Sequence, residues 1–139
     1  MEKSLVLIKP DAIQRGLVGT IIARLEKLGV KLVAMKMLHM DKALAQRHYD
    51  IHKDKPFFDN LVNYITSAPI IAIIFEGEKA VEVIRKTMGA TDPAKAETGT
   101  IRGDFGVNIE QNSVHGSDST ETATREIELF FSEDEIFDY

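Results

Sequence analysis

His115 is the residue of this sequence whose surroundings most favour a chemical role. It lies in the stretch Asn112–Ser119, between a short apolar segment and the start of a helix. Such a turn places an imidazole beside exposed backbone N–H groups, which attract anions. A neutral imidazole is also a competent nucleophile near pH 7, because its unperturbed pKa is about 6.5. These residues alone leave open both a nucleophile and an ordinary surface or satisfied core histidine. The ordinary interpretation is the one we prefer for His39 and His48.

Five stretches of the sequence match, in order, the motifs of one enzyme family. They are Lys9–Asp11, His52 with Pro56–Phe58, Gly89–Pro93, Gly99–Phe105 and Asn112–Ser119. Each motif is weak by itself, but together they cover nearly the whole chain in the right order and at the right separations. The sequence therefore resembles the nucleoside diphosphate kinases. The resemblance implies a ping-pong transfer of the γ-phosphate of a nucleoside triphosphate to a nucleoside diphosphate, through a phosphate carried on Nδ1 of His115.

The resemblance also implies a set of phosphate-binding residues. Lys9 resembles the lysine that holds the transferring phosphate, and Arg85, Thr91 and Arg102 resemble the groups that clamp the distal phosphates. Phosphoryl transfer needs positioning and charge neutralisation, and arginine suits bidentate contacts with phosphate. No cluster of metal ligands stands out, so we expect Mg²⁺ to arrive on the nucleotide. A Walker A motif is absent, which excludes a P-loop kinase.

A second set of residues resembles those that bind the nucleoside and line the phosphate site. Phe57 follows a proline and resembles the aromatic side chain that stacks on the base, with Leu61 one helical turn later. Ile109 stands where many family members carry valine. Because stacking tolerates every base, broad base specificity is expected. Two further expectations concern Asn112, which resembles a residue that bonds the sugar hydroxyl, and the pair Tyr49 and His52, which resemble residues at the phosphate site.

Glu126 is an unusual residue for the buried face of a helix, because a buried carboxylate needs a partner. In the family the equivalent glutamate orients the catalytic histidine. A helix begun at Asp118 would carry Glu126 roughly 12 Å away, so the helix must fold back across the strand of His115. Asp118 and Glu121 resemble a capping box for that helix. Ser117 could serve as a cap, or could bond Glu126 or the phosphate.

The elements that must position these side chains follow from the apolar pattern. Strands are expected at Leu5–Lys9, Leu32–Met40 and Ile70–Phe75, with a brief fourth at Ser113–His115. Helices are expected over 18–28 and 79–88, each stopped by glycine, over 42–67 with a bend near Pro56, and from Asp118 onward. Residues 89–112 show no period and predict a long irregular loop. The expected fold is an α/β (α+β) sandwich, ferredoxin-like βαββαβ, with an antiparallel four-stranded sheet.

The bulk composition limits the classes of function. With 139 residues and 44% hydrophobic content, the chain predicts one domain, residues 1–139. The net charge of −5 argues against a general nucleic-acid surface, and an RNA-binding module would also need exposed aromatic side chains on its strands. There is no cysteine, which fits the cytoplasm. Neither the apolar run Leu5–Ile8 nor Ile70–Phe75 is long enough for a signal peptide or a membrane span.

The oligomeric state is expected from the same resemblance. The family forms hexamers or tetramers built from dimers, so a homo-oligomer is expected, with the hexamer favoured and the long loop at its three-fold contacts. The acidic tail from Ser132 to Tyr139 is expected on the surface or against a neighbouring subunit. The alternative of a catalytically silent family member is opposed by the joint presence of the site residues named above.

Overall fold

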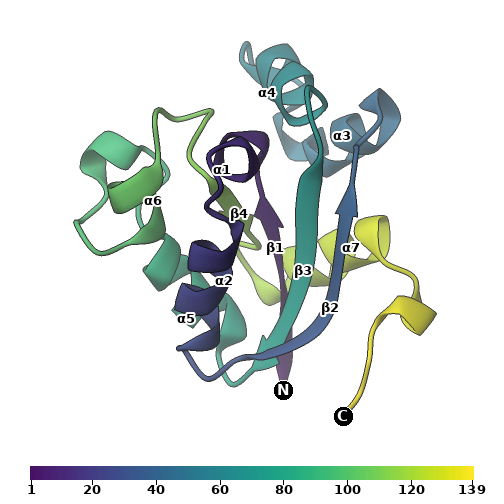
Figure 1. Ribbon diagram of the computed structural model, residues 1–139. Helices are drawn as coiled ribbons and strands as arrows, with labels where there is room; N and C mark the ends of the chain where they lie inside the picture. Colours follow the sequence, from purple (N-terminus) through teal and green to yellow (C-terminus); the bar gives the residue numbers. More distant parts are fainter.

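The computed structural model describes residues 1–139, which form one four-stranded antiparallel sheet with helices on both faces (Figure 1). The strands lie in the order β2-β3-β1-β4. Their bounds are Glu2–Ile8 for β1, Lys31–Leu38 for β2, Ile70–Gly77 for β3 and Val114–Gly116 for β4. The helices are α1 (Pro10–Gln14), α2 (Val18–Glu26), α3 (Lys42–His48), α4 (Phe58–Ile65), α5 (Ala80–Met88), α6 (Ile101–Phe105) and α7 (Thr120–Phe130). This is the ferredoxin-like arrangement expected from the sequence.

Strand β1 lies between β3 and β4, and its successive side chains pack alternately into two separate cores. Leu5 and Leu7 join the core beneath α3, α4 and α7, whereas Val6 and Ile8 join the core beneath α2 and α5. All four are fully buried. An uninterrupted apolar run is the pattern of a strand covered on both faces, because alternate side chains point to opposite sides.

The pairing of β1 with β4 brings the segment around His115 beside the end of β1. Strand β4 pairs with β1 so that His115 lies opposite Leu7, and the backbone N–H of Lys9 donates to the carbonyl of Ser113 over 2.9 Å. Helix α7 then turns back and packs on β1. Its N-cap is Ser119, whose hydroxyl accepts from the backbone N–H of Thr122. The expected capping box from Asp118 is therefore wrong by one residue.

Two short helices were not expected from the sequence. Helix α1 begins at Pro10, directly after β1, and α6 interrupts the stretch 89–112 that was expected to be an irregular loop. A single 3-10 turn at Pro93–Lys95 further orders that stretch. Each α-helix has five residues, too few to display a helical period, and α6 is held by the Thr100 hydroxyl, which accepts from the N–H of Gly103.

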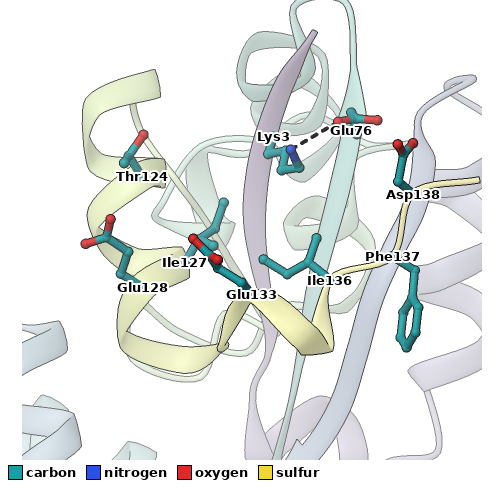
Figure 2. A pocket seen from close by; sticks show the side chains of 9 residues that line it. All are labelled: Lys3, Glu76, Thr124, Ile127, Glu128, Glu133, Ile136, Phe137 and Asp138. Carbon is teal, nitrogen blue, oxygen red and sulfur yellow. Dashed lines mark ion pairs between the residues drawn. The ribbon is translucent and has the colours of Figure 1, made fainter.

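The C-terminal segment packs along the chain's own edge strand. The backbone N–H of Phe137 donates to the carbonyl of Val33 over 2.9 Å, and Lys36 forms an ion pair with Glu135 at 3.0 Å. Between this segment, α7 and the strands lies a cavity of about 610 Å³, whose side chains include the ion pair of Lys3 with Glu76 (Figure 2). No helix of the structure combines the length and apolar character needed to cross a membrane.

Candidate active site

A second cavity of about 610 Å³ lies at the other end of β1 and collects the residues singled out in the sequence. It has four cationic side chains against three carboxylates, whereas the cavity of Figure 2 has four carboxylates against one lysine and would repel phosphate. All twelve expected site residues line it: Lys9, Tyr49, His52, Phe57, Leu61, Arg85, Thr91, Arg102, Ile109, Asn112, His115 and Glu126. The structure thus brings together every residue that the resemblance named.

His115 is held by a carboxylate behind its ring. Its Nε2 lies 2.9 Å from Oε2 of Glu126, and the Ser117 hydroxyl donates to Oε1 of the same carboxylate over 2.7 Å. Burial by itself would raise the pKa of Glu126, but the bonds from His115 and Ser117 lower it overall. An ionised carboxylate can only accept, so Nε2 of His115 carries the proton and Nδ1 keeps its lone pair. The His115 side chain is 23% exposed, which leaves it open to the cavity.

The position of Glu126 resolves the separation expected from the sequence. Because α7 packs back on β1, its second turn passes the strand that carries His115. Ser117 adds to this connection, since its Oγ also accepts the backbone N–H of Leu5 on β1. Ser117 therefore does not cap α7. It links β1 to the carboxylate instead.

Lys9 lies at the end of β1 and is 6% exposed. Its Nζ donates to Oδ1 of Asn112 over 2.8 Å, and the amide nitrogen of Asn112 donates to the carbonyl of Thr91 over 3.0 Å. Burial, and then the nearby charge of Arg102, lower the pKa of Lys9 to about 8. A buried ammonium group without a salt bridge favours the approach of an anion.

The two arginines come from different helices and converge near β4. Arg102 of α6 donates to the carbonyl oxygens of Gly89 and Val114, over 3.1 and 2.9 Å. Its Nε is buried and has no partner, and burial together with the charge of Arg85 lowers its pKa to about 10. Arg85 of α5 donates to the carbonyl of Gly116 over 3.3 Å. Both guanidinium groups are thereby fixed by backbone carbonyls on either side of His115.

Apolar side chains form the outer part of the cavity. Phe57, directly before α4, is 42% exposed, and Ile109, in the segment after α6, is 57% exposed. The Phe57 ring also contacts the ring of His52, with centroids 5.5 Å apart. Leu61 lies one turn further along α4. Exposed apolar side chains at a cavity mouth can bind a planar, partly apolar group by stacking.

Several residues of the cavity were missed by the sequence interpretation. They are His48, Ile51, Glu110, Thr122 and Arg125. His39 is exposed, as expected, but the interpretation of His48 as a surface or satisfied core residue is wrong. His48 is buried and neither ring nitrogen has a hydrogen-bond partner. Nothing in the sequence around His48, which directly precedes Tyr49, indicates this.

An imidazole with a fixed tautomer, facing a cavity lined by one lysine and three arginines, defines a phosphoryl-transfer site. Comparisons with known proteins give the family. Residues 2–136 match the sequence model of the family described as nucleoside diphosphate kinase. The chain is 61% identical over 139 residues to a nucleoside diphosphate kinase of Dehalococcoides mccartyi, which covers all of this chain and 98% of that protein. It is 55% identical to the Archaeoglobus fulgidus enzyme, over all of this chain and 92% of the relative.

Solved structures agree with this assignment. A nucleoside diphosphate kinase of Halobacterium salinarum, solved in complex with CDP, matches with a TM-score of 0.97 and 48% identity, over 99% of this chain and 92% of that one. A protein of the same family from Babesia bovis matches with a TM-score of 0.96 and 42% identity, over 100% and 94% of the two chains. The chain belongs to the nucleoside diphosphate kinase family. Its activity is the transfer of phosphate between nucleotides.

Proposed function

We propose that His115 carries the phosphate between the two nucleotides. The lone pair of Nδ1 attacks the γ-phosphorus of a triphosphate, the bond from that phosphorus to the bridging oxygen breaks, and the diphosphate leaves with the electron pair. A terminal oxygen of a second diphosphate then attacks the same phosphorus and breaks its bond to Nδ1. The observation that carries this proposal is the 2.9 Å contact between Nε2 of His115 and Glu126, because it leaves Nδ1 as the free nucleophile.

The cations of the cavity are assigned to the phosphates. Lys9, Arg85 and Arg102 would neutralise the charge on the equatorial oxygens of the transferring group, and Thr91 would bind a distal phosphate. Preorganised donors of this kind lower the barrier because they need no rearrangement during the reaction. Support comes from the backbone carbonyls that fix both arginines and from the burial of the Lys9 ammonium group.

The outer part of the cavity is assigned to the nucleoside. Phe57 would stack on the base, with Leu61 and Ile109 beside it, and none of these side chains can read a base edge. Broad base specificity follows from that. Asn112 would bond the sugar hydroxyl through its side-chain amide, whose oxygen accepts from Lys9 and whose nitrogen donates to Thr91 in this structure. Tyr49 and His52 would close the wall between the base and the phosphates, and burial already raises the pKa of the Tyr49 hydroxyl.

Magnesium is assigned to the nucleotide. The chain has one cluster of three metal-binding side chains, His48, His115 and Glu126, and its two nitrogens suit Mg²⁺ poorly. Mg²⁺ would therefore be held by phosphate oxygens and water, and the carboxylates of Glu110 and Asp118 on the cavity wall would accept hydrogen bonds from its water ligands. When bound, Mg²⁺ supplies positive charge between the phosphate groups.

We also propose that the chain acts as a single domain, in the cytoplasm, within a homo-oligomer for which the hexamer is favoured and the tetramer is possible. The shared sheet beneath both cores supports the single domain. The edge strand β2 exposes Met35 and Met37, 53% and 60% exposed, which supports association. Sedimentation at micromolar concentration tests this, and a monomer would refute it.

The test of the catalytic proposal is incubation with γ-labelled ATP and Mg²⁺ without an acceptor. We expect label that is acid-labile, stable in alkali, absent from His115→Ala and released by any nucleoside diphosphate. Failure of the wild-type protein to take up label would instead favour a catalytically silent family member. Label released only by purine diphosphates would refute the assignment of the base-binding residues while leaving His115 in place.

A further inference from the structure

His48 is a buried polar side chain without a hydrogen bond. The residue is 3% exposed, and both Nδ1 and Nε2 lack a partner. Leaving buried polar atoms unpaired is unfavourable, so a structure that does so at the active site calls for a physical reason. The reason lies in what surrounds the ring.

The ring of His48 lies against the two groups that hold the nucleophile. It makes a T-shaped contact with the ring of His115, with centroids 4.7 Å apart. Its Nδ1 lies 3.7 Å from Oε2 of Glu126, the same oxygen that contacts His115. That separation is longer than a hydrogen bond, and a shift of less than an ångström would close it.

The His48 ring is neutral. Burial, and then the nearby His115, lower its pKa to about 3, although Glu126 opposes the shift. A protonated ring here would compete with His115 for the Glu126 carboxylate. A neutral ring carries one N–H donor and one acceptor, so it can approach the carboxylate without drawing it away from His115.

The backbone of His48 is tied to the helix that carries Glu126. The guanidinium group of Arg125 donates to the carbonyl oxygens of Arg47 and His48, over 3.1 and 3.4 Å. Arg125 directly precedes Glu126 in α7, so these bonds fix the end of α3 against the same turn of α7. Phe130, one turn further along α7, makes a T-shaped contact with the His48 ring, with centroids 5.5 Å apart. The Arg125 hydrogen bonds and the Phe130 contact therefore hold His48 beside Glu126.

We propose that His48 is a positioning residue for phosphotransfer, whose neutral ring packs against His115 and directs an Nδ1–H group at the Glu126 oxygen that His115 binds. The role rests on the proposed function of His115. When His115 takes up the phosphate its ring gains positive charge, and the carboxylate is drawn towards Nε2. The Nδ1–H group of His48 then closes on Oε2 and keeps the carboxylate an acceptor, so that the proton stays on Nε2 of His115.

Two variants of opposite character test this proposal. His48→Asn is smaller than histidine but places an amide near the position of Nδ1, whereas His48→Phe keeps the ring and removes both nitrogens. We expect His48→Asn to be phosphorylated by ATP within about threefold of the wild-type rate in a single turnover. We expect His48→Phe to be at least about tenfold slower, with an unchanged KM for nucleotides. The Tm of each variant shows whether it is folded.

The order of the two variants decides the matter. A purely packing role predicts the reverse order, with His48→Phe active and His48→Asn impaired, and that result overturns the proposal. Equal rates for the two variants also overturn it. The ¹⁵N shifts of the wild-type histidines give a second test that needs no variant: His48 protonated on Nε2 instead of Nδ1 would refute the proposal. Absence of label on the wild-type protein would be a failure of the His115 assignment alone.

Discussion

Replacing Glu126 with glutamine would keep the size of the side chain and remove its charge. Oε1 could still accept the Ser117 hydroxyl, now at 2.7 Å, but an amide N–H₂ group would then face Nε2 of His115 in place of an oxygen. Two N–H groups cannot bond to each other. To regain a bond, His115 would move its proton from Nε2 to Nδ1, and Nδ1 would lose the lone pair that attacks phosphorus.

The size of the effect follows from the bond that is lost. A hydrogen bond to a charged group contributes about 1.5–3 kcal/mol. If that contribution is made in the transition state, its loss slows phosphorylation roughly 10- to 150-fold. The wrong tautomer adds to this, so we expect Glu126→Gln at or beyond the upper end of that range. Binding of the nucleotide does not use Glu126, so KM should change little.

The assay is rapid mixing of enzyme in excess with γ-labelled ATP and Mg²⁺, followed by an alkaline quench that preserves phosphohistidine. Single-turnover conditions separate phosphorylation from the second half of the reaction. Glu128→Gln is the matched control, because Glu128 is an exposed residue of the same helix and lines the cavity of Figure 2. A folded Glu126→Gln variant that is phosphorylated within threefold of the wild-type rate would refute the role given to the carboxylate.

Four further predictions follow from the site and the fold. Because burial and Arg102 lower the pKa of Lys9 to about 8, kcat/KM should fall as the pH rises above about 8, and a pH profile of Lys9→Arg should lose that alkaline limb. The same pKa shift affects stability, because the ordinary pKa of Lys9 in the unfolded chain is 10.5 and the unfolded chain therefore binds this proton more tightly than the folded one. The contribution of Lys9 to the free energy of unfolding should rise with pH between about 8 and 10.5, which denaturation at several pH values would show. Arg102→Ala should slow turnover by about 10²- to 10³-fold, and a folded variant within a few-fold of wild type would contradict its assignment. Phe57→Ala should raise KM for purine and pyrimidine diphosphates alike, by roughly 5- to 150-fold, whereas a base-dependent change in steady-state kinetics would argue against stacking. Ser119→Ala should lower the free energy of unfolding in urea by about 1 kcal/mol, with Asp118→Ala as a control that leaves the α7 cap intact.

The sequence predicted the sheet well because its strands carry strong patterns. Residues 5–8 and 70–75 are continuous apolar runs, and the structure buries both between two layers of helices. Helix α5 ends at Gly89, whose φ of 87° is left-handed, as expected of a glycine stop. The five-residue helices α1 and α6 were missed because a single turn has no period and depends on local contacts such as the Thr100 cap.

The site was predictable where motifs name residues and unpredictable where contacts cross between elements. The cavity gathers all twelve expected residues. The resemblance named Glu126, but only the packing of α7 on β1 shows how its carboxylate reaches His115. His48 and Arg125 could not be found by spacing, because their positions depend on how the end of α3 meets α7. The spacing of Asp118 and Glu121 predicts a capping box, but Ser119 is also a good capping residue and only the backbone geometry shows that it is the N-cap.

The pairing of β1 with β4 has a consequence for how the protein is made. Lys9 leaves the ribosome about a hundred residues before Ser113 and His115, which lie beside the end of β1 in the folded sheet. Local segments such as α2 can form early, but the pairing of β4 with β1 must wait for most of the chain and for the closure of a long loop. A nascent chain therefore gains no partial activity as it lengthens. Catalytic competence arrives in one late step, after α7 has emerged and docked on β1.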